Sequence, residues 1–322
     1  MQKEYLKGVI GIDAIKRQVI FYIKNFETTG IFKNCLVVGA KGTGKTHLIR
    51  EMARHLTERN SGRIRKFVEI NCASLKNLNE FFVIVNEHIS NCECTIYFDE
   101  SEELDKEISI ALLSILEVNE QKRTQYVYQG ETHVFDFRNV SFIFSTTDPQ
   151  KMLNPLIDRL EVINVPAYNT KDLAEIVSNN LKNVKMDNEA LNSLASVTRG
   201  NPRSCVKLSD NIKDYLKRKQ KTDLSLEDCK KIYQELSIYP LGLNQSELQI
   251  LETLKSNSRC SLTRLAAILG GSTQMIRRFD ETFLLKNGLI EISPSRGREL
   301  TGKGANYLRI LKESSCSQEK NS

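Results

Sequence analysis

The spacing of apolar residues divides the chain into a first part with short apolar runs and a second part with helical periodicity. Short, mostly apolar runs occur in the first part at residues 35–38, 67–70, 95–98, 140–145 and 161–165. Segments with helical spacing, such as 108–117, separate these runs. Short apolar runs are typical of buried strands, and their alternation with helices indicates a parallel sheet covered on both faces. We therefore predict an α/β domain over residues 1–167.

Helical spacing continues through the middle of the chain. Thr170 begins a Thr-Lys-Asp-Leu segment in which it is the expected helix cap, and further helices are predicted over 187–197 and 204–216. A Pro-Leu-Gly turn at 240–242 marks the next boundary. Residues 168–239 are therefore predicted to form an all-helical domain.

The C-terminal part has a different order of elements. Three helical segments are predicted there, over residues 245–255, 262–269 and 273–286. Residues 288–301 then carry two strand-like segments around a basic Arg-Gly-Arg turn, as in a β-hairpin. Three short helices followed by such a wing are typical of a winged helix, which we predict over residues 240–312. The polar residues 313–322 are expected to be disordered.

Composition narrows the class of protein. The chain has 322 residues, of which 40% are hydrophobic, which is enough for the cores of two or three domains. It contains no apolar run long enough to span a membrane and no signal peptide at its N-terminus. Among eight cysteines only Cys92 and Cys94 lie close together, which makes neither a zinc site nor a disulfide framework. We expect a cytoplasmic protein with reduced thiols and no membrane partner. The net charge of +6 permits a nucleic-acid partner without requiring one.

The strongest chemical signal is the segment 39–46, which reads Gly-Ala-Lys-Gly-Thr-Gly-Lys-Thr and fits G-x-x-x-x-G-K-[ST]. A predicted strand precedes it and a predicted helix follows it, which is the context that this phosphate-binding motif requires. Backbone N–H groups of such a loop surround phosphate oxygens, and the helix N-terminus adds positive potential. Lys45 would reach the β- and γ-phosphates and Thr46 would hold Mg²⁺. The alternative is an accidental glycine-rich turn. We predict binding of a nucleoside triphosphate.

Two acids, Asp99 and Glu100, close the run 95–98. The carboxyl end of a parallel strand faces the ligand crevice, so Asp99 is expected to support Mg²⁺ and Glu100 to activate the attacking water. A surface Asp-Glu pair that begins a helix is the alternative. Three further residues are candidates for the site, although each is a weak signal when taken alone. They are Thr147 at the end of the next long strand, Arg159 and Arg203.

The order of these motifs resembles that of the AAA+ ATPases and, more closely, that of the RuvB family of Holliday-junction branch-migration motors. The resemblance covers nearly the whole chain. Its ATPase part consists of Val9-Ile10-Gly11 (the family's adenine-side Tyr-Ile-Gly box), Ser145-Thr146-Thr147 (its Ala-Thr-Thr sensor 1), residues 155–159 (its arginine finger), Tyr168 (the start of its lid) and Gly200-Asn201-Pro202-Arg203 (its Gly-Thr-Pro-Arg sensor 2). The segments 242–244 and 294–298 resemble the start and the wing of the family's C-terminal domain, and the wing match is the part that is specific to RuvB.

The resemblance implies an AAA+ parallel-sheet domain, a helical lid and a winged helix, assembled into a ring, often a hexamer, with ATP and Mg²⁺ between subunits. Arg159 would act on the neighbour's γ-phosphate, Thr147 would be sensor 1, and Arg203 would close the lid on its own nucleotide. Asn71 would restrain Glu100. The implied nucleotide contacts are Val9, Ile10, Gly39, Lys41, Gly42, Thr43, Gly44, Lys45, Thr46, His47, Tyr168, Pro202 and Arg203.

Some positions depart from the family pattern. Ile157 replaces the first arginine of the family's finger, and the basic N-terminal arm is shortened. Residues 124–137 are predicted to form the hairpin that contacts RuvA in the family, with a turn near Gly130, but the tip has a different sequence. These departures indicate a divergent member whose partner is a RuvA-like protein or another effector.

Two functions remain open at this point. The first is a ring motor that moves duplex or branched DNA by ATP hydrolysis, as a branch-migration helicase does in recombination and repair. The alternative is an ATP-switched adaptor on DNA that recruits a nuclease, a transposase or a defence effector. A transcription regulator with a vestigial ATPase fits poorly, because the acid pair and the finger are intact. Residues expected to contact DNA phosphates are Arg277, Arg278, Arg296 and Arg298.

Overall fold

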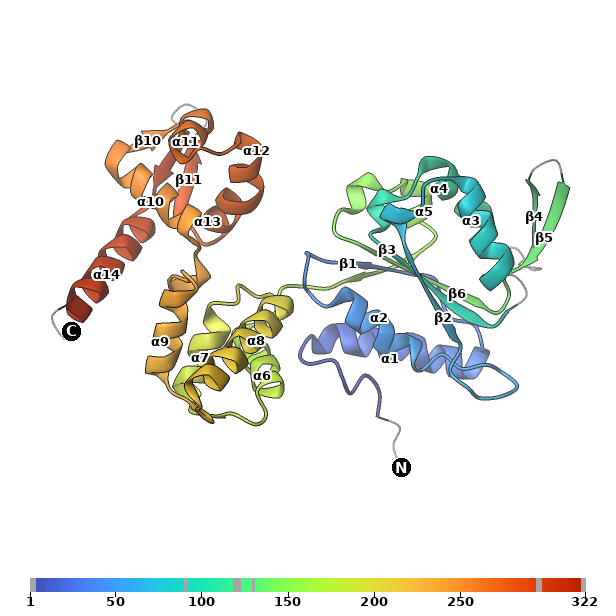
Figure 1. Cartoon of the computed structure of the whole chain (residues 1–322). Helices are drawn as coiled ribbons and strands as arrows, with labels where there is room; N and C mark the ends of the chain where they lie inside the picture. The colour runs from blue at the N-terminus through green and yellow to red at the C-terminus, as the bar shows by residue number, and fades with distance from the viewer. Residues whose placement is uncertain (1–3, 90–91, 118–122, 129–130, 294–296, 320–322) are drawn as a thin grey trace. The chain divides into compact units, whose positions relative to one another are not determined.

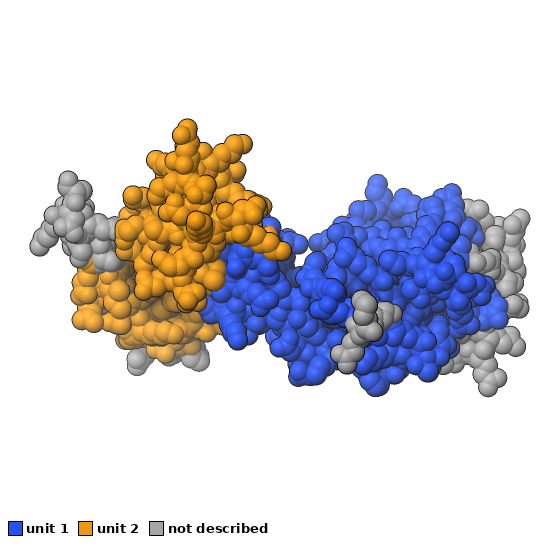
Figure 2. Space-filling view, turned by 90° about the horizontal axis from the view of Figure 1, so that it is seen from below, with its two compact units in different colours: residues 1–179, 200–207 blue, residues 180–199, 208–322 orange. Residues whose placement is uncertain are grey.

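The computed structural model describes residues 4–89, 92–117, 123–128, 131–293 and 297–319. They belong to two compact units, which Figure 2 shows in different colours. The first unit comprises Met1–Asn179 with Gly200–Lys207, and the second comprises Asn180–Arg199 with Leu208–Ser322. Within the described part of the chain, no helix is both long and apolar enough to cross a membrane.

A five-stranded sheet organises the first unit, and all of its strand pairs are parallel, as predicted. The strand order is β2-β3-β6-β1-β7. The strands are β1 (Cys35–Val38), β2 (Lys66–Asn71), β3 (Cys94–Asp99), β6 (Val140–Thr146) and β7 (Glu161–Asn164). Every residue of β6 is buried, because this strand lies in the middle of the sheet between β3 and β1.

Helices cover both faces of this sheet (Figure 1). Helices α1 (Asp13–Thr29) and α2 (Lys45–Ala53) cover one face, and α3 (Leu78–Ile84) and α4 (Lys106–Ile115) cover the other. Side chains of a strand alternate between faces, so Val37 packs with α1 and α2 whereas Leu36 packs with α3 and α4. This double burial explains why the strands read as continuous apolar runs.

The predicted hairpin is present as β4 (Arg123–Tyr128) and β5 (Glu131–Asp136). The two strands are antiparallel, and Tyr128 pairs with Glu131. The expected turn near Gly130 lies outside the described residues.

The segment predicted to be all-helical contains α6 (Thr170–Asn180), α7 (Asn188–Ser196), α8 (Pro202–Lys219) and α9 (Leu226–Glu235). Two details of that prediction were wrong. Asn169 caps α6 in place of Thr170, since its Oδ1 accepts a hydrogen bond from the Asp172 N–H at 2.8 Å. Two-residue strands, β8 (Lys185–Met186) and β9 (Asp223–Leu224), also pair in parallel.

The C-terminal part is a winged helix, as predicted. Its helices are α10 (Gln245–Asn257), α11 (Leu262–Leu269) and a third helix in which α12 (Thr273–Met275) and α13 (Thr282–Lys286) flank a π-helical segment, Ile276–Glu281. A short strand, β10 (Arg259–Cys260), joins the wing strands β11 (Ile290–Ser293) and β12 (Gly297–Leu300) in one sheet. One apolar cluster lies beneath these elements, built around Leu251, Leu284 and Leu289.

The predicted disordered tail is instead largely helical. Helix α14 runs over Gly302–Glu319, well past residue 313. The sequence from 305 to 319 contains neither glycine nor proline, so it holds no signal that would end the helix.

Candidate active site

The phosphate-binding loop connects β1 to α2, as the sequence predicted. Gly42 and Gly44 have φ values of +85° and +84°, a region that favours glycine. A Cβ atom on Gly39 would lie 2.9 Å from the carbonyl oxygen of Val165, so a side chain does not fit there. The backbone geometry of the loop therefore demands the glycines that define the motif.

Lys45 is folded back onto this loop. Its Nζ donates hydrogen bonds to the carbonyl oxygens of Gly39 at 2.8 Å and Ala40 at 3.2 Å. Burial lowers the pKa of Lys45, and the carboxylates of Glu102 and Asp99 oppose that shift. Phosphate oxygens bind an ammonium group more strongly than carbonyl oxygens do. The arrangement suits an amine that exchanges these carbonyls for a bound phosphate.

The two predicted metal ligands, Thr46 and Asp99, are joined through a chain of hydroxyl groups. Thr46 Oγ1 lies 3.1 Å from the hydroxyl of Tyr97, which lies 2.9 Å from Ser145 Oγ. Ser145 donates to Asp99 Oδ1 at 2.7 Å. A hydroxyl and a carboxylate are ligands that suit Mg²⁺, which usually completes its shell with water and phosphate oxygens.

Glu100 follows Asp99 directly and is exposed. Its φ of +55° is uncommon for a residue with a side chain, and such backbone strain is concentrated at functional sites. Asn71, the predicted restraint on Glu100, uses its Oδ1 to accept a hydrogen bond from the Ala73 N–H at 2.9 Å. The structure thus gives Asn71 a local capping role, and its action on Glu100 stays a prediction.

Glu102 is a residue that the sequence analysis missed. Its Oε1 accepts hydrogen bonds from the backbone N–H of Thr147 at 3.1 Å and from the Thr147 hydroxyl at 2.6 Å. Burial raises the pKa of Glu102, but hydrogen bonds from Thr146 and Thr147 outweigh burial and hold the pKa below its usual value. Its other oxygen, Oε2, is buried without a hydrogen-bond partner among the described residues. Glu102 therefore holds the residue expected to sense the γ-phosphate.

The segment expected to act as sensor 2 lies against the phosphate-binding loop. The backbone N–H of Arg203 donates to the carbonyl of Gly42 at 3.2 Å, and Asn201 Nδ2 donates to the carbonyl of Lys41 at 3.1 Å. Pro202 begins α8 beside them. The Arg203 guanidinium is exposed, and its charge contributes to lowering the pKa of Lys45. The structure thus places the Arg203 backbone against the phosphate-binding loop, and its action on the nucleotide stays a prediction.

The segment that carries the expected adenine-side residues is tied to α2, the helix that follows the loop. Val9 is buried and Ile10 is half-buried. His47 Nε2, on α2, lies 2.7 Å from the carbonyl oxygen of Gly8, which ties this N-terminal segment to the helix after the loop. A Cβ on Gly44 would lie 3.7 Å from the Tyr168 hydroxyl, whose pKa burial raises to about 12.

The side chain of Arg159 makes its described hydrogen bond within its own turn. It follows α5 (Asn154–Ile157), is exposed, and donates to the carbonyl of Pro155 at 2.9 Å. This position is compatible with the predicted action on a neighbouring subunit.

The predicted DNA-contacting arginines differ in what the structure shows of them. Arg277 is exposed. Arg298 is paired inside the domain, because its Nη2 donates to Glu281 Oε1 at 3.0 Å and only 11% of its side chain is exposed, and its contact with DNA stays a prediction. A carboxylate as buried as Glu281, with 4% exposure, requires such a cation. Arg296 and the side chain of Arg278 lie outside the described residues.

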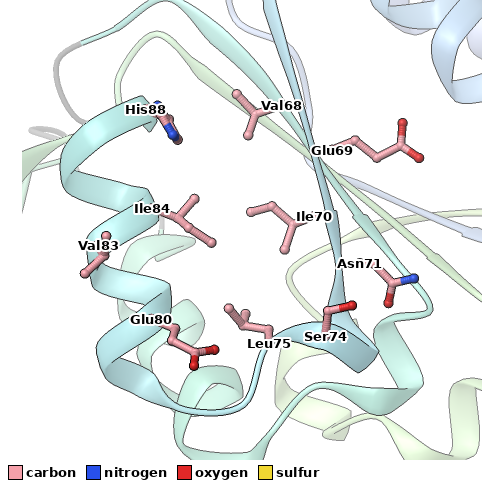
Figure 3. Close-up of a pocket in the computed structure, with 10 residues that line it drawn as sticks. All are labelled: Val68, Glu69, Ile70, Asn71, Ser74, Leu75, Glu80, Val83, Ile84 and His88. Carbon is pink, nitrogen blue, oxygen red and sulfur yellow. The ribbon is translucent and has the colours of Figure 1, made fainter.

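A pocket of about 510 Å³ lies elsewhere, between the edge strand β2 and helix α3 (Figure 3). Val68, Ile70 and Ile84 face it from these two elements. Asn71, the predicted restraint on Glu100, lines it, but none of the residues expected to contact the nucleotide does, so it is not the predicted nucleotide site.

Comparisons with known proteins agree with this geometry. Residues 35–166 match the ATPase family associated with various cellular activities (AAA), and residues 240–309 match the RuvB C-terminal winged helix domain. The chain is similar to the Holliday junction branch migration complex subunit RuvB of Mycoplasmopsis pulmonis, with 28% identity over 86% of this chain and 87% of that protein. The RuvB subunit of Lactobacillus johnsonii is also 28% identical, over 96% and 90% of the two chains. The fold resembles the Thermotoga maritima RuvB Holliday junction branch migration motor, with a TM-score of 0.75, 22% identity, and coverage of 96% and 98%.

The contact between Glu102 and Thr147 leads to a prediction. Replacing Glu102 with Ala removes the acceptor for both Thr147 donors, and we expect kcat for ATP hydrolysis to fall about a hundredfold, as for other misplaced catalytic groups. Nucleotide affinity should change little, because Lys45 and the loop are intact. The control is Glu103→Ala, which removes an exposed carboxylate that pairs with Lys151. Steady-state kinetics in which Glu102→Ala keeps the wild-type kcat would contradict the positioning role.

Proposed function

Because the chain belongs to the RuvB family of AAA+ ATPases, we propose that it hydrolyses ATP to move duplex DNA at branched junctions. The observation that carries the proposal is the combination of two parts in one chain. An ATPase domain with its loop, acid pair and arginines precedes a winged helix of the RuvB type. Relatives that share this combination over nearly their whole length are named as branch-migration subunits.

The site supplies what phosphoryl transfer from ATP requires, which is positioning and charge neutralisation. Lys45 binds the terminal phosphates, while Thr46 and Asp99 would hold Mg²⁺. When bound, that ion neutralises charge on the phosphate oxygens. Glu100 orients and deprotonates the attacking water. Thr147, held by Glu102, contacts the γ-phosphate beside this water.

Several further features belong to the same proposal. The protein acts in the cytoplasm as a ring, with three functional parts over residues 1–167, 168–239 and 240–312. Arg159 completes the site of the adjacent subunit, and Arg203 couples the state of the nucleotide to the helices after it. The β4–β5 hairpin is the surface for a RuvA-like partner or another effector.

The experiment for the motor uses a synthetic four-way DNA junction. The wild-type protein should separate it into duplexes while it hydrolyses ATP. Glu100→Gln should still bind ATP, since the loop and Asp99 remain, but should lose hydrolysis and junction separation together. Lys45→Ala should lose nucleotide binding as well. Glu103→Gln, which alters a nearby exposed acid, serves as the control.

Two results would contradict this scheme in different ways. Wild-type hydrolysis rates in Glu100→Gln would remove Glu100 from the mechanism. Rapid hydrolysis by the wild-type protein that leaves junctions intact, even with candidate partners added, would favour the ATP-switched adaptor.

The trans action of Arg159 has its own test. Arg159→Ala should bind ATP but lose hydrolysis about a thousandfold or more, as in other enzymes with an arginine finger. Mixing Arg159→Ala with Glu100→Gln subunits should restore part of the activity, because some interfaces then combine an intact Glu100 with an intact Arg159. Phosphate release from mixed assemblies, verified by mass, measures this. Verified mixed assemblies without activity would exclude a finger that acts across the interface.

DNA contact by the winged helix should depend on salt. If the exposed Arg277 neutralises one phosphate, Arg277→Ala should reduce the slope of log affinity against log salt concentration by about 0.9. Arg309→Ala removes another exposed arginine, on α14, and serves as the control. The measurement is a salt titration of duplex binding. Equal slopes in all three proteins would show that Arg277 does not contact DNA.

A further inference from the structure

A buried chain of hydroxyl groups connects the phosphate-binding loop to the acid at the end of β3. Its members are Thr46, Tyr97, Ser145 and Asp99, joined by contacts of 3.1, 2.9 and 2.7 Å. Tyr97 and Ser145 have no exposed surface. Buried hydroxyl groups are costly unless they are hydrogen-bonded, and here each of the two has a partner on both sides.

The sheet explains why these residues meet. In the parallel pairing of β3 with β6, Tyr97 lies opposite Ile143. Because side chains alternate along a strand, Asp99 and Ser145, each two residues further on, point to the same face as Tyr97. That face is covered by α2, whose first turn carries Thr46. The ring of Tyr97 stacks on Phe67, with 6.1 Å between ring centroids, which holds its orientation.

The directions of the hydrogen bonds follow from the number of protons available. The Ser145 hydroxyl donates its single proton to Asp99 Oδ1. Ser145 must then accept the proton of Tyr97, and Tyr97 must accept the proton of Thr46.

The proton of the Thr46 hydroxyl therefore points toward Tyr97, and the lone pairs of the Thr46 oxygen are left for a cation. We propose that Tyr97 and Ser145 are positioning residues that orient the Thr46 hydroxyl and the Asp99 carboxylate for Mg²⁺. The inference rests on the Mg²⁺–nucleotide binding proposed for this site.

Packing alone does not require these two hydroxyl groups. Phenylalanine would fill nearly the same volume as Tyr97, and the family that this chain resembles carries alanine where Ser145 stands. Without Tyr97, Ser145 would keep its hydrogen bond to Asp99 but lose the donor from which it accepts, and without Ser145, Tyr97 would lose the acceptor for its proton. The two hydroxyl groups therefore depend on each other. The groups that they contact on either side, Thr46 and Asp99, are the two expected metal ligands.

The test measures Mg²⁺ dependence in the whole protein without relying on turnover. Fluorescent ADP is titrated over a range of Mg²⁺ concentrations and in EDTA, with wild type, Tyr97→Phe and Ser145→Ala. Loss of a residue that orients a metal ligand typically costs ten- to a hundredfold in metal affinity. Each variant should therefore need about tenfold more Mg²⁺ for half-maximal tightening of nucleotide binding, while its affinity in EDTA matches wild type.

The control is Tyr22→Phe. Tyr22 is also a buried tyrosine of this unit, but its hydroxyl contacts Glu161 on β7 at 3.3 Å, away from the loop. Its Mg²⁺ midpoint should equal that of wild type. In the double variant Tyr97→Phe/Ser145→Ala, the shift should not exceed the larger single shift by much, because either change already interrupts the chain.

Three results would overturn the proposal. The first is a wild-type Mg²⁺ midpoint in both single variants. The second is an equal loss of affinity with and without Mg²⁺, which would mean a packing role only. The third is nucleotide binding by the wild type that does not respond to Mg²⁺, which would also remove the metal from the proposed function. If Tyr97→Phe melts far below wild type, Ser145→Ala, which deletes a single oxygen atom, decides the question.

Discussion

The parallel pairing of β6 with β3 on one side and β1 on the other is the constraint on which the active site depends. These three strands end at the same edge of the sheet, where they deliver the phosphate-binding loop, the acid pair and Thr147. A slip of one residue in either pairing would turn every side chain to the opposite face. Because β6 is buried along its whole length, the apolar core opposes any such slip. Core packing and catalytic geometry are thus held by the same register.

The charged side chains at that edge of the sheet, Lys45, Asp99 and Glu102, each have hydrogen-bond partners. Lys45 is buried and is bonded to loop carbonyls, and the acids near it, Asp99 and Glu102, each accept hydrogen bonds from hydroxyl groups of β6 or of the residue after it. Hydrogen bonds to a carboxylate favour its charged form. These hydrogen bonds keep the pKa of Glu102 below its usual value and hold the polar side chains of Ser145 and Thr147 in place, while Glu100 remains exposed.

Buried acids in the second unit are also compensated by a partner of opposite charge. Two of its buried acids have a dedicated arginine, since Glu281 pairs with Arg298 and Glu247 pairs with Arg199. The Arg199 guanidinium also lies 4.1 Å from the centre of the Phe283 ring. Removing one member of such a pair leaves a buried charge without compensation. Arginines near a wing are thus not all available to DNA, and their number in the sequence overstates the phosphate-binding surface.

The amino-acid sequence by itself determined the parallel sheet, the phosphate-binding loop, the acid pair and the winged helix. These features can be predicted because each depends on residues that are close in sequence. Glycine at 42 and 44 reflects the backbone conformation of the loop, and the apolar runs and helical spacing reflect which side chains are buried. Only the tertiary structure decided the contact of Glu102 with Thr147, the hydroxyl chain through Tyr97, and the internal role of Arg298. The members of the first contact are 45 positions apart, and strand pairing alone brings them within hydrogen-bond distance. Sequence patterns report which face a residue prefers, whereas its partner on that face depends on the order of strands in the folded sheet.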